Sequence, residues 1–168
     1  MFTVGYAVYL FVLCIVLALL EIQIEGQNGW ASALPCWRPK PESRIAAWYS
    51  RVMDGKPLTG YHIAIFSLVL IVLHQPFFTG VRWSIVKELE VLSAYFLVAV
   101  CWDFLWFVFN PAYGLKRFKP EFIGWHRDWV GPLPVAYISG FSLSLLLFAI
   151  AVLIILSGGS LRQQSCRF

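Results

Sequence analysis

Charged residues are scarce in this sequence. Asp, Glu, Lys and Arg make up 13% of its 168 residues, whereas 60% are hydrophobic. Soluble domains average about 25% charged and about 45–50% apolar residues. A chain of this length cannot bury so much apolar surface in a single core that faces water. The composition therefore excludes an ordinary soluble domain and a disordered chain, and it predicts a protein whose solvent is largely lipid.

Several signatures of known functional classes are also missing. None of the four cysteines forms a Cys-x-x-Cys pair, which argues against a four-helix thiol oxidoreductase. Three histidines are too few for a His-rich di-iron desaturase or hydroxylase, and the sequence has no Ser-centred nucleophile elbow. No basic run interleaves with aromatic residues, so nucleic acid is not an expected partner. The sequence has no internal repeat and no broken helix pair, which disfavours transport.

Four long apolar runs are present, at about residues 3–20, 61–79, 89–109 and 135–156. About 20 residues at 1.5 Å per residue cross a hydrocarbon core of about 30 Å, and a backbone in lipid must bond internally as a helix. The first run lacks the Lys or Arg that usually precedes a signal peptide, so we expect it to remain as a helix. The predicted fold is all-α: a membrane four-helix bundle, with residues 1–168 as one polytopic domain.

The distribution of Lys and Arg predicts the orientation of this bundle. Nine of the 13 lie between the first and second runs or between the third and fourth. The other four are Arg82, Lys87, Arg162 and Arg167. Basic residues concentrate in cytoplasmic loops. We therefore expect both long loops in the cytoplasm and both termini on the non-cytoplasmic side.

The first of these loops contains an amphipathic pattern. Ile45, Trp48 and Val52 recur at helical spacing within residues 41–53, and Arg44 and Arg51 stand beside them. Such a pattern is typical of a short helix that lies in the headgroup plane. The Asp-Gly pair at residues 54–55 is a turn signal that ends it. We predict an interfacial helix here.

Five ionisable residues are expected to meet at the cytoplasmic face. Glu21 and Glu25 follow the first run, His62 opens the second, Asp103 lies about two turns before the end of the third, and His126 lies in the next loop. Carboxylates and imidazoles are the ligands of non-haem iron, manganese and zinc sites. All five are candidate metal ligands, and Asp103, Glu21 and His62 are also the candidate catalytic residues.

The position of Asp103 makes this hypothesis specific. A lone carboxylate inside a membrane helix costs about 2.5–3.5 kcal/mol on insertion scales, so we expect it within about 6 Å of Glu21 or His62. The plainer alternative is a structural network. In that interpretation the two glutamates are interfacial charges, His62 contacts headgroups, and His126 is a polar residue among tryptophans. Asp103 is then a cap or pairs with an Arg or Lys from a loop.

Two further features lie outside this group. His74 and Glu88 are expected near the opposite face, where they are able to pair. Gly140 and Ser144 form a small-xxx-small step in the uncharged fourth run. Small residues let membrane helices approach closely, so this step predicts a packing seam, either within the chain or between copies.

The sequence leaves three functions open. The first is a membrane-embedded enzyme that acts on a lipid, isoprenoid or quinone-like substrate with the help of a divalent metal. The second is a redox subunit that binds haem or quinone, with His62 and His126 as axial ligands, although His126 lies in a loop rather than on a helix. The third is a non-catalytic accessory or assembly subunit of a membrane complex. Expected partners are membrane lipids, a hydrophobic small molecule, and another copy or a larger complex through the fourth helix.

Overall fold

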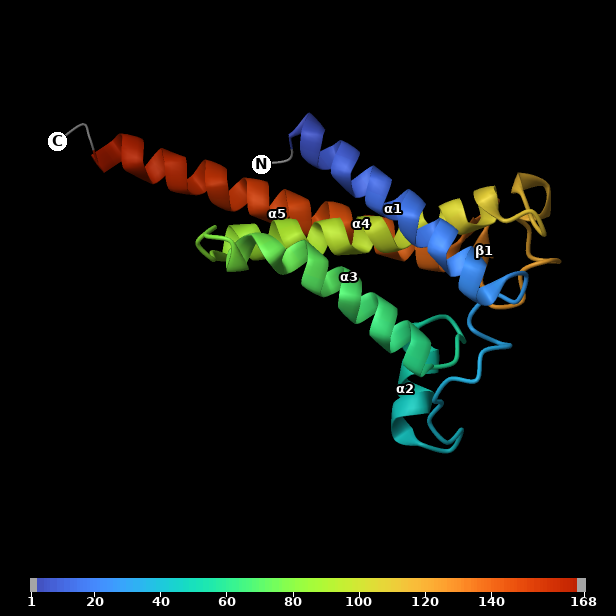
Figure 1. Ribbon diagram of the computed structural model, residues 1–168. Helices are drawn as coiled ribbons and strands as arrows, with labels where there is room; N and C mark the ends of the chain where they lie inside the picture. The colour runs from blue at the N-terminus through green and yellow to red at the C-terminus, as the bar shows by residue number, and fades with distance from the viewer. Residues whose placement is uncertain (1–2, 166–168) are drawn as a thin grey trace.

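The computed structural model describes residues 3–165, with side chains through residue 158. The described chain is mostly helical (Figure 1). Its elements are α1 (Val4–Glu25), α2 (Arg44–Val52), α3 (Gly60–Phe78), α4 (Ile85–Phe109), the 3-10 turn η1 (Leu115–Arg117), β1 (Trp129–Val130), β2 (Leu133–Pro134) and α5 (Val135–Ser165). The two short strands form an antiparallel hairpin in which Trp129 pairs with Pro134. The sequence analysis did not predict this hairpin.

Local capping explains where four of the helices begin. The residue before each is a Ser or Thr whose side chain accepts a hydrogen bond from the backbone N–H three residues later. These N-caps are Thr3, Ser43, Thr59 and Ser84. Each satisfies one of the backbone donors that a helix start leaves unpaired.

The four predicted apolar runs are all helices that are long and apolar enough to cross a membrane. The main difference is that α1 continues five residues past the apolar run, to Glu25. Its buried side chains form a stripe at helical spacing: Leu10, Cys14, Leu17, Ala18, Glu21 and Glu25. Both glutamates lie on this buried stripe. The packed face of α1 therefore extends beyond the apolar run and supports the helix as far as Glu25. Gly26, with a φ of 62°, then terminates the helix.

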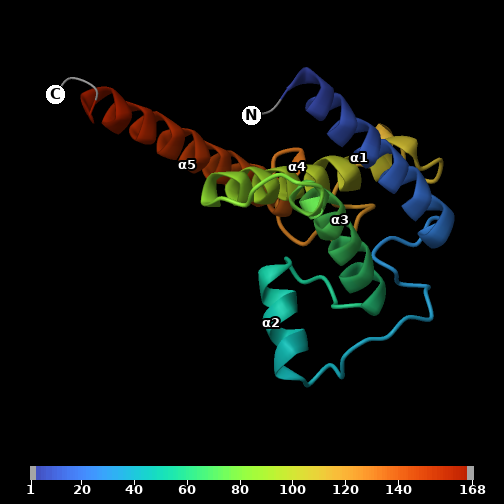
Figure 2. The ribbon, with the colours of Figure 1, turned by 60° about the vertical axis from the view of Figure 1, so that its left-hand side comes forward.

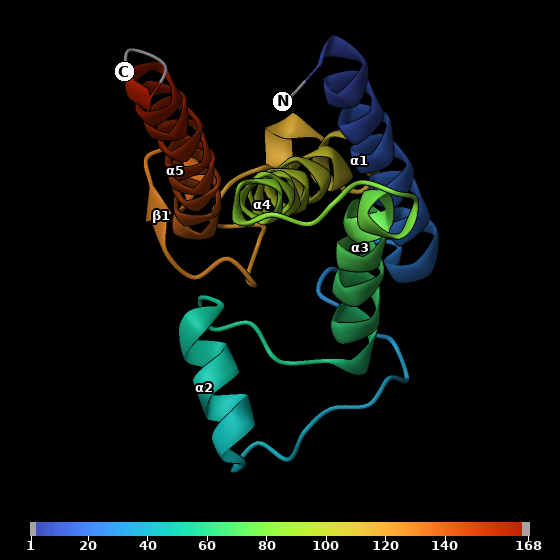
Figure 3. The ribbon, with the colours of Figure 1, turned by 90° about the vertical axis from the view of Figure 1, so that its left-hand side faces the viewer.

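Helix α4 occupies the centre of the molecule. Figure 3, which looks along α4, shows α5 on one side of it and α1 and α3 on the other. α1 and α5 make the most extensive contacts with α4, and α3 makes fewer. The core accordingly includes Val91, Ala94, Val98 and Trp102 of α4. The helices therefore surround one central element.

The long connections lie together at one end of the helices. In Figure 1 the start of α1 and the end of α5 are on the left, whereas β1, the end of α1 and the end of α4 are on the right. We call the end that carries residues 26–59 and 110–134 the loop end. The sequence prediction placed these two segments on one face, and the fold agrees. Which side of a membrane that face occupies stays a prediction.

The predicted amphipathic helix is present as α2. None of its residues is buried, and its apolar side chains Ile45, Trp48 and Val52 are each more than half exposed. Figures 2 and 3 show α2 set apart from the four long helices. A helix that leaves its apolar face unpacked in this way suits a headgroup boundary.

The small-xxx-small step packs within the chain. A Cβ added at Gly140 would lie 2.7 Å from Val100 Cγ2 of α4, so only glycine fits there without movement. One turn later, Ser144 Oγ donates to the Ser93 carbonyl at 2.8 Å, and Ser93 Oγ donates to the Ser144 carbonyl at 2.9 Å. These contacts fix α5 against α4. Of the two alternatives for this step, the structure shows the seam inside one chain.

Candidate functional site

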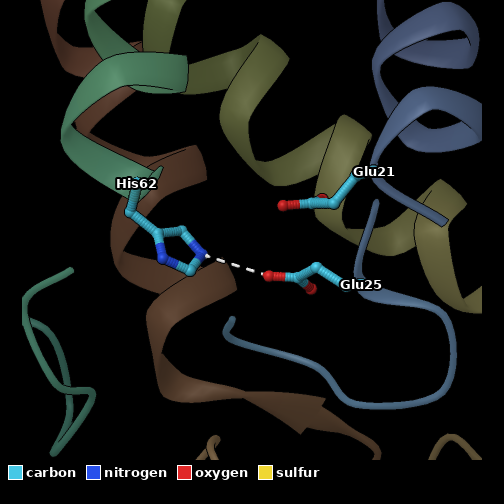
Figure 4. Close-up of side chains that lie close together, drawn as sticks. All are labelled: Glu21, Glu25 and His62. Atoms are coloured by element: carbon cyan, nitrogen blue, oxygen red, sulfur yellow. Dashed lines mark ion pairs between the residues drawn. The ribbon is translucent and has the colours of Figure 1, made fainter. Parts of the chain in front are cut away.

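Three buried side chains from two helices converge at the loop end. Glu21, Glu25 and His62 each offer one ligand atom, and these atoms all lie within 4.8 Å of one another. Figure 4 shows both carboxylates and the imidazole pointing into the same space. His62 Nε2 lies 3.9 Å from Glu25 Oε1, and both side chains are 3% exposed. This group is named the Glu–His cluster below.

The local sequence explains how the three side chains are aimed. Glu21 and Glu25 are one helical turn apart, so they share the buried face of α1. His62 lies in the first turn of α3, where its Nδ1 is 2.7 Å from the hydroxyl of the N-cap Thr59. That bond fixes the ring and leaves Nε2 facing the glutamates. Histidines that bind metals are commonly oriented by such a bond at the other ring nitrogen.

The segment after α1 closes the cluster from outside the helices. Trp30 and Ala31 both have a positive φ, at 56° and 53°, a conformation that is uncommon for residues other than glycine. The Trp30 ring stacks on His62 with centroids 3.9 Å apart, and its Nε1–H donates to the Pro57 carbonyl at 2.8 Å. The Ala31 N–H donates to Glu25 Oε1 at 2.5 Å. Strained backbone of this kind persists where the surroundings hold it, often at functional sites.

Asp103 is held by two donors from other parts of the chain. His126 Nε2 lies 3.2 Å from Asp103 Oδ2, and the Tyr137 hydroxyl donates to the same oxygen. His126 comes from the segment between α4 and α5, and Tyr137 comes from the first turn of α5. Asp103 therefore pairs with a histidine and a tyrosine. Among the described residues it forms no hydrogen bond or ion pair with a loop Arg or Lys, the pairing expected in the structural-network interpretation.

A small cavity joins Asp103 to the Glu–His cluster. Its volume is about 10 Å³, and its lining is Glu21, Glu25, Gly29, Trp30, His62, Asp103, Trp106 and Trp125. A space of roughly 10–15 Å³ by this measure holds one water-sized group. The Trp106 side chain is 3% exposed, and its indole N–H has no hydrogen-bond partner among the described residues. We call this space the inner cavity.

A second, much larger space lies next to the inner cavity. It has a volume of about 720 Å³ and is lined by residues 27–30, 32, 54–57, 124, 125 and 127, with Arg38 and Tyr113. Gly29, Trp30 and Trp125 line both spaces and so form the wall between them. A Cβ added at Gly29 would lie 2.3 Å from the Trp125 ring, so the two residues touch closely. We call this space the outer chamber.

The outer chamber contains an unusual lysine. Lys56 is only 5% exposed, and its ammonium lies 4.5 Å from the centre of the Trp30 ring. Burial lowers the pKa of Lys56 because the charged form loses its hydration. No hydrogen bond or ion pair of this ammonium is found within the described part of the chain.

The loops that build both spaces are fixed by long-range hydrogen bonds. Asn110, at the end of α4, donates to the Gly26 carbonyl at the end of α1, at 2.7 Å. Asp54 Oδ2 accepts from the backbone N–H of Arg127 at 3.0 Å and from that of Asp128 at 3.4 Å. The two long connecting segments are thus tied to each other and to the helix ends.

Four of the five predicted site residues line one cavity. They are Glu21, Glu25, His62 and Asp103. The fifth, His126, bonds to Asp103 and is not among the residues that line the cavity. His74 and Glu88, whose pairing the sequence left open, form a separate pair, with His74 Nε2 3.1 Å from Glu88 Oε1. Whether the five residues act as ligands or catalysts stays a prediction.

Sequence reasoning missed Trp30, Lys56 and Tyr137. The Trp30 ring is a wall of both spaces, Lys56 is the buried cation, and Tyr137 orients Asp103. An interfacial tryptophan, a loop lysine and a helix-end tyrosine are ordinary in a membrane protein. Nothing in their spacing distinguishes them from anchors.

Comparisons of this chain with known proteins found no match. No family model, curated protein or solved structure matches the chain. The function is therefore inferred from the geometry of these residues.

Proposed function

We propose that this is an integral membrane protein whose Glu–His cluster binds a divalent metal ion and forms the active site of an enzyme acting on an amphiphilic substrate. The observation that carries the proposal is the convergence of Glu21, Glu25 and His62, all buried, with ligand atoms within 4.8 Å of one another. Two carboxylates and one imidazole suit zinc, manganese or iron.

Charge balance supports a cation at this place. Two glutamates face each other in a buried space, and the carboxylate of Asp103 lines it too. Glu21 accepts a long bond from the Tyr61 hydroxyl at 3.4 Å, and Glu25 accepts from the Ala31 N–H at 2.5 Å. Buried carboxylates need donors or a counter-ion. A divalent cation would neutralise the two glutamates and use the oxygens left without donors.

Three protein ligands leave room for chemistry. Catalytic metal sites commonly have three protein ligands and an open position for water or substrate. Such an ion polarises a substrate oxygen or lowers the pKa of a bound water. Asp103 lines the same cavity, and its Oδ2 accepts from both His126 and Tyr137. Its other carboxylate oxygen is then available to accept or return a proton from a group in the cavity.

The surfaces of the long helices support membrane insertion. Large apolar side chains are exposed along all four, including Phe11 of α1, Ile71 of α3, Phe109 of α4 and Leu146 of α5. Exposed apolar surface of this extent is stable in lipid and not in water. The cluster lies within the last turns of α1 and the first turn of α3, so it would sit near the headgroup level. A substrate with a polar end and an apolar body fits this depth.

The haem alternative receives no support from the geometry. A haem between His62 and His126 needs a space far larger than the 10 Å³ of the inner cavity. His126 is also engaged by Asp103 and packed against the rings of Phe107, Trp129 and Tyr137.

Metal content tests the proposed function directly. The protein, purified in mild detergent and desalted after incubation with zinc, manganese or ferrous iron, should retain one divalent ion per chain by elemental analysis. Glu25→Gln and His62→Gln each remove a ligand and should lose most of that metal.

Glu88→Gln is the matched control, because Glu88 also pairs with a histidine but lies at the other end of the helices. It should retain wild-type metal content. Wild-type protein that retains no metal, or Glu25→Gln and His62→Gln variants that retain as much as wild type, would contradict the proposal. The accessory-subunit interpretation would then be preferred.

A further inference from the structure

The outer chamber has the features of an anion site. Lys56, Arg38 and Arg127 line it, against a single carboxylate, Asp54. That carboxylate is already used, since Asp54 Oδ2 accepts two backbone N–H groups from residues 127 and 128. The chamber therefore has an excess of positive charge on its wall.

Lys56 is the strongest evidence for a ligand in this chamber. Its side chain is 95% removed from solvent, yet the described residues give its ammonium no anionic partner within ion-pair distance. Its ammonium lies over the face of the Trp30 ring. The carboxylates of Asp103, Asp54 and Glu21 act on Lys56 only from beyond ion-pair distance, and burial lowers its pKa, because an ammonium buried without a close carboxylate or phosphate is costly. An anion in the chamber would supply the missing partner.

The chamber also adjoins the Glu–His cluster. Trp30, Gly29 and Trp125 separate the two spaces, and Trp30 contacts both Lys56 and His62. A group held by Lys56 would thus be one side chain away from the cluster. The chamber volume of about 720 Å³ lies within the roughly 300–1,000 Å³ usual for small-molecule sites.

We propose that the outer chamber binds the phosphate of an amphiphilic substrate, a phosphate monoester or diphosphate on a lipid chain, through Lys56 with Arg38 and Arg127. This inference rests on the proposed function, because a divalent cation bound by the Glu–His cluster would offset the charges of Glu21 and Glu25. Without that cation the two glutamates would repel a phosphate nearby. Arg38 is well placed to stay rigid. Its guanidinium donates to the Leu34, Cys36 and Ala31 carbonyls at 3.1, 3.2 and 2.5 Å.

The test measures phosphate binding to the full chain in phosphatidylcholine nanodiscs. Three probes are titrated separately: inorganic phosphate, short-chain phosphatidic acid, and the matched uncharged diacylglycerol. Intrinsic tryptophan fluorescence reports binding because Trp30 and Trp125 line the chamber. We expect phosphatidic acid to bind, diacylglycerol to bind at least about tenfold more weakly, and inorganic phosphate to compete with the lipid.

Variants assign the binding to the chamber. Lys56→Gln should weaken phosphatidic acid binding at least about tenfold, and Arg127→Gln, at an exposed position, should weaken it severalfold. Lys116→Gln removes an exposed cation from the same end of the molecule but outside the chamber, and should bind as wild type does. Gel filtration identifies any Lys56→Gln protein that fails to fold, in which case Arg127→Gln decides the result.

Three results would overturn the inference: no binding of phosphatidic acid, equal binding of diacylglycerol, or equal losses in Lys116→Gln and the chamber variants. If free phosphate binds as tightly as the lipid, the anion site stands and its ligand is a soluble phosphate rather than a lipid, which overturns the lipid part. Metal content separates the two proposals. Metal-loaded protein without phosphate binding contradicts only this inference. Protein that retains no metal contradicts the proposed function, and Lys56-dependent binding by that protein would show that the chamber holds its anion without the cation.

Discussion

At the scale of single residues, Asp103 links the Glu–His cluster to the rest of the fold. Its carboxylate faces the inner cavity from α4, and its Oδ2 accepts from a loop histidine and from a tyrosine of α5. Three separate segments must therefore be in place before Asp103 is oriented. Both donors reach the same oxygen, and among the described residues the other oxygen has no hydrogen-bond donor.

Replacement of Asp103 tests this role. Asp103→Asn removes the negative charge beside the cluster while keeping the size of the side chain. Residues that orient or support metal ligands typically contribute about 10–100-fold to metal affinity, and we expect a loss of that size in zinc titrations. Helical content by circular dichroism should stay unchanged.

Asp128→Asn serves as the control, since Asp128 is exposed and does not line the cavity. It should bind zinc as tightly as wild type does. Wild-type affinity in Asp103→Asn would remove Asp103 from the site and leave it a purely structural residue.

At the scale of elements, the packing of α5 on α4 holds Tyr137 against Asp103. The contact is close because α5 places Gly140 beside Val100 and then exchanges hydrogen bonds between Ser144 and Ser93. These two steps come one and two turns after Tyr137 along the same helix face. Separation of the two helices would therefore also move the donor of Asp103.

Gly140→Leu should disturb this seam. The new side chain would meet Val100 at a distance that no Cβ tolerates, so α5 must shift. Overpacking of this kind costs about 1–3 kcal/mol, and we expect that loss in reversible unfolding measured in mixed micelles. Gly158→Leu is the matched control in the same helix, because a Cβ there meets nothing within 4 Å. Equal stability of the two variants would contradict the proposed seam.

At the scale of the whole molecule, both long connecting segments lie at the loop end and carry most of the basic residues. From the positive-inside rule we predict that the loop end, with both spaces, faces the cytoplasm. A chamber at that end would meet anionic headgroups of the cytoplasmic leaflet.

Thiol labelling tests this orientation. Cys36 lies in the first long connection and is partly exposed, and Cys166 lies outside the described residues, after the fourth apolar run. With Cys14 and Cys101 replaced by alanine, a membrane-impermeant maleimide added to intact cells should label Cys166 and not Cys36. Permeabilised cells should show labelling at both. Labelling of Cys36 alone in intact cells would reverse the predicted topology.

The pattern of apolar runs was enough to predict the four long helices and the placement of the polar residues at one end of them. Apolar runs of membrane length must be helices in lipid, and successive crossings return the chain to the same face. From this alone Glu21, Glu25, His62 and Asp103 were expected together, and they line one cavity. The same reasoning placed His74 and Glu88 near the opposite end without deciding whether they pair, and the structure shows the pair.

Which partners each of those residues contacts depends on the tertiary structure. His126 was grouped with the candidate ligands, yet it bonds to Asp103, because the 110–134 segment folds back over α4. Trp30 and Lys56 lie at the site because long-range hydrogen bonds, such as that from Asn110 to Gly26, hold residues 26–59 against the helix ends. Such contacts join residues far apart in the chain, and no local pattern of hydrophobicity or spacing encodes them. Periodicity is a property of each segment, whereas a cavity depends on how the segments meet.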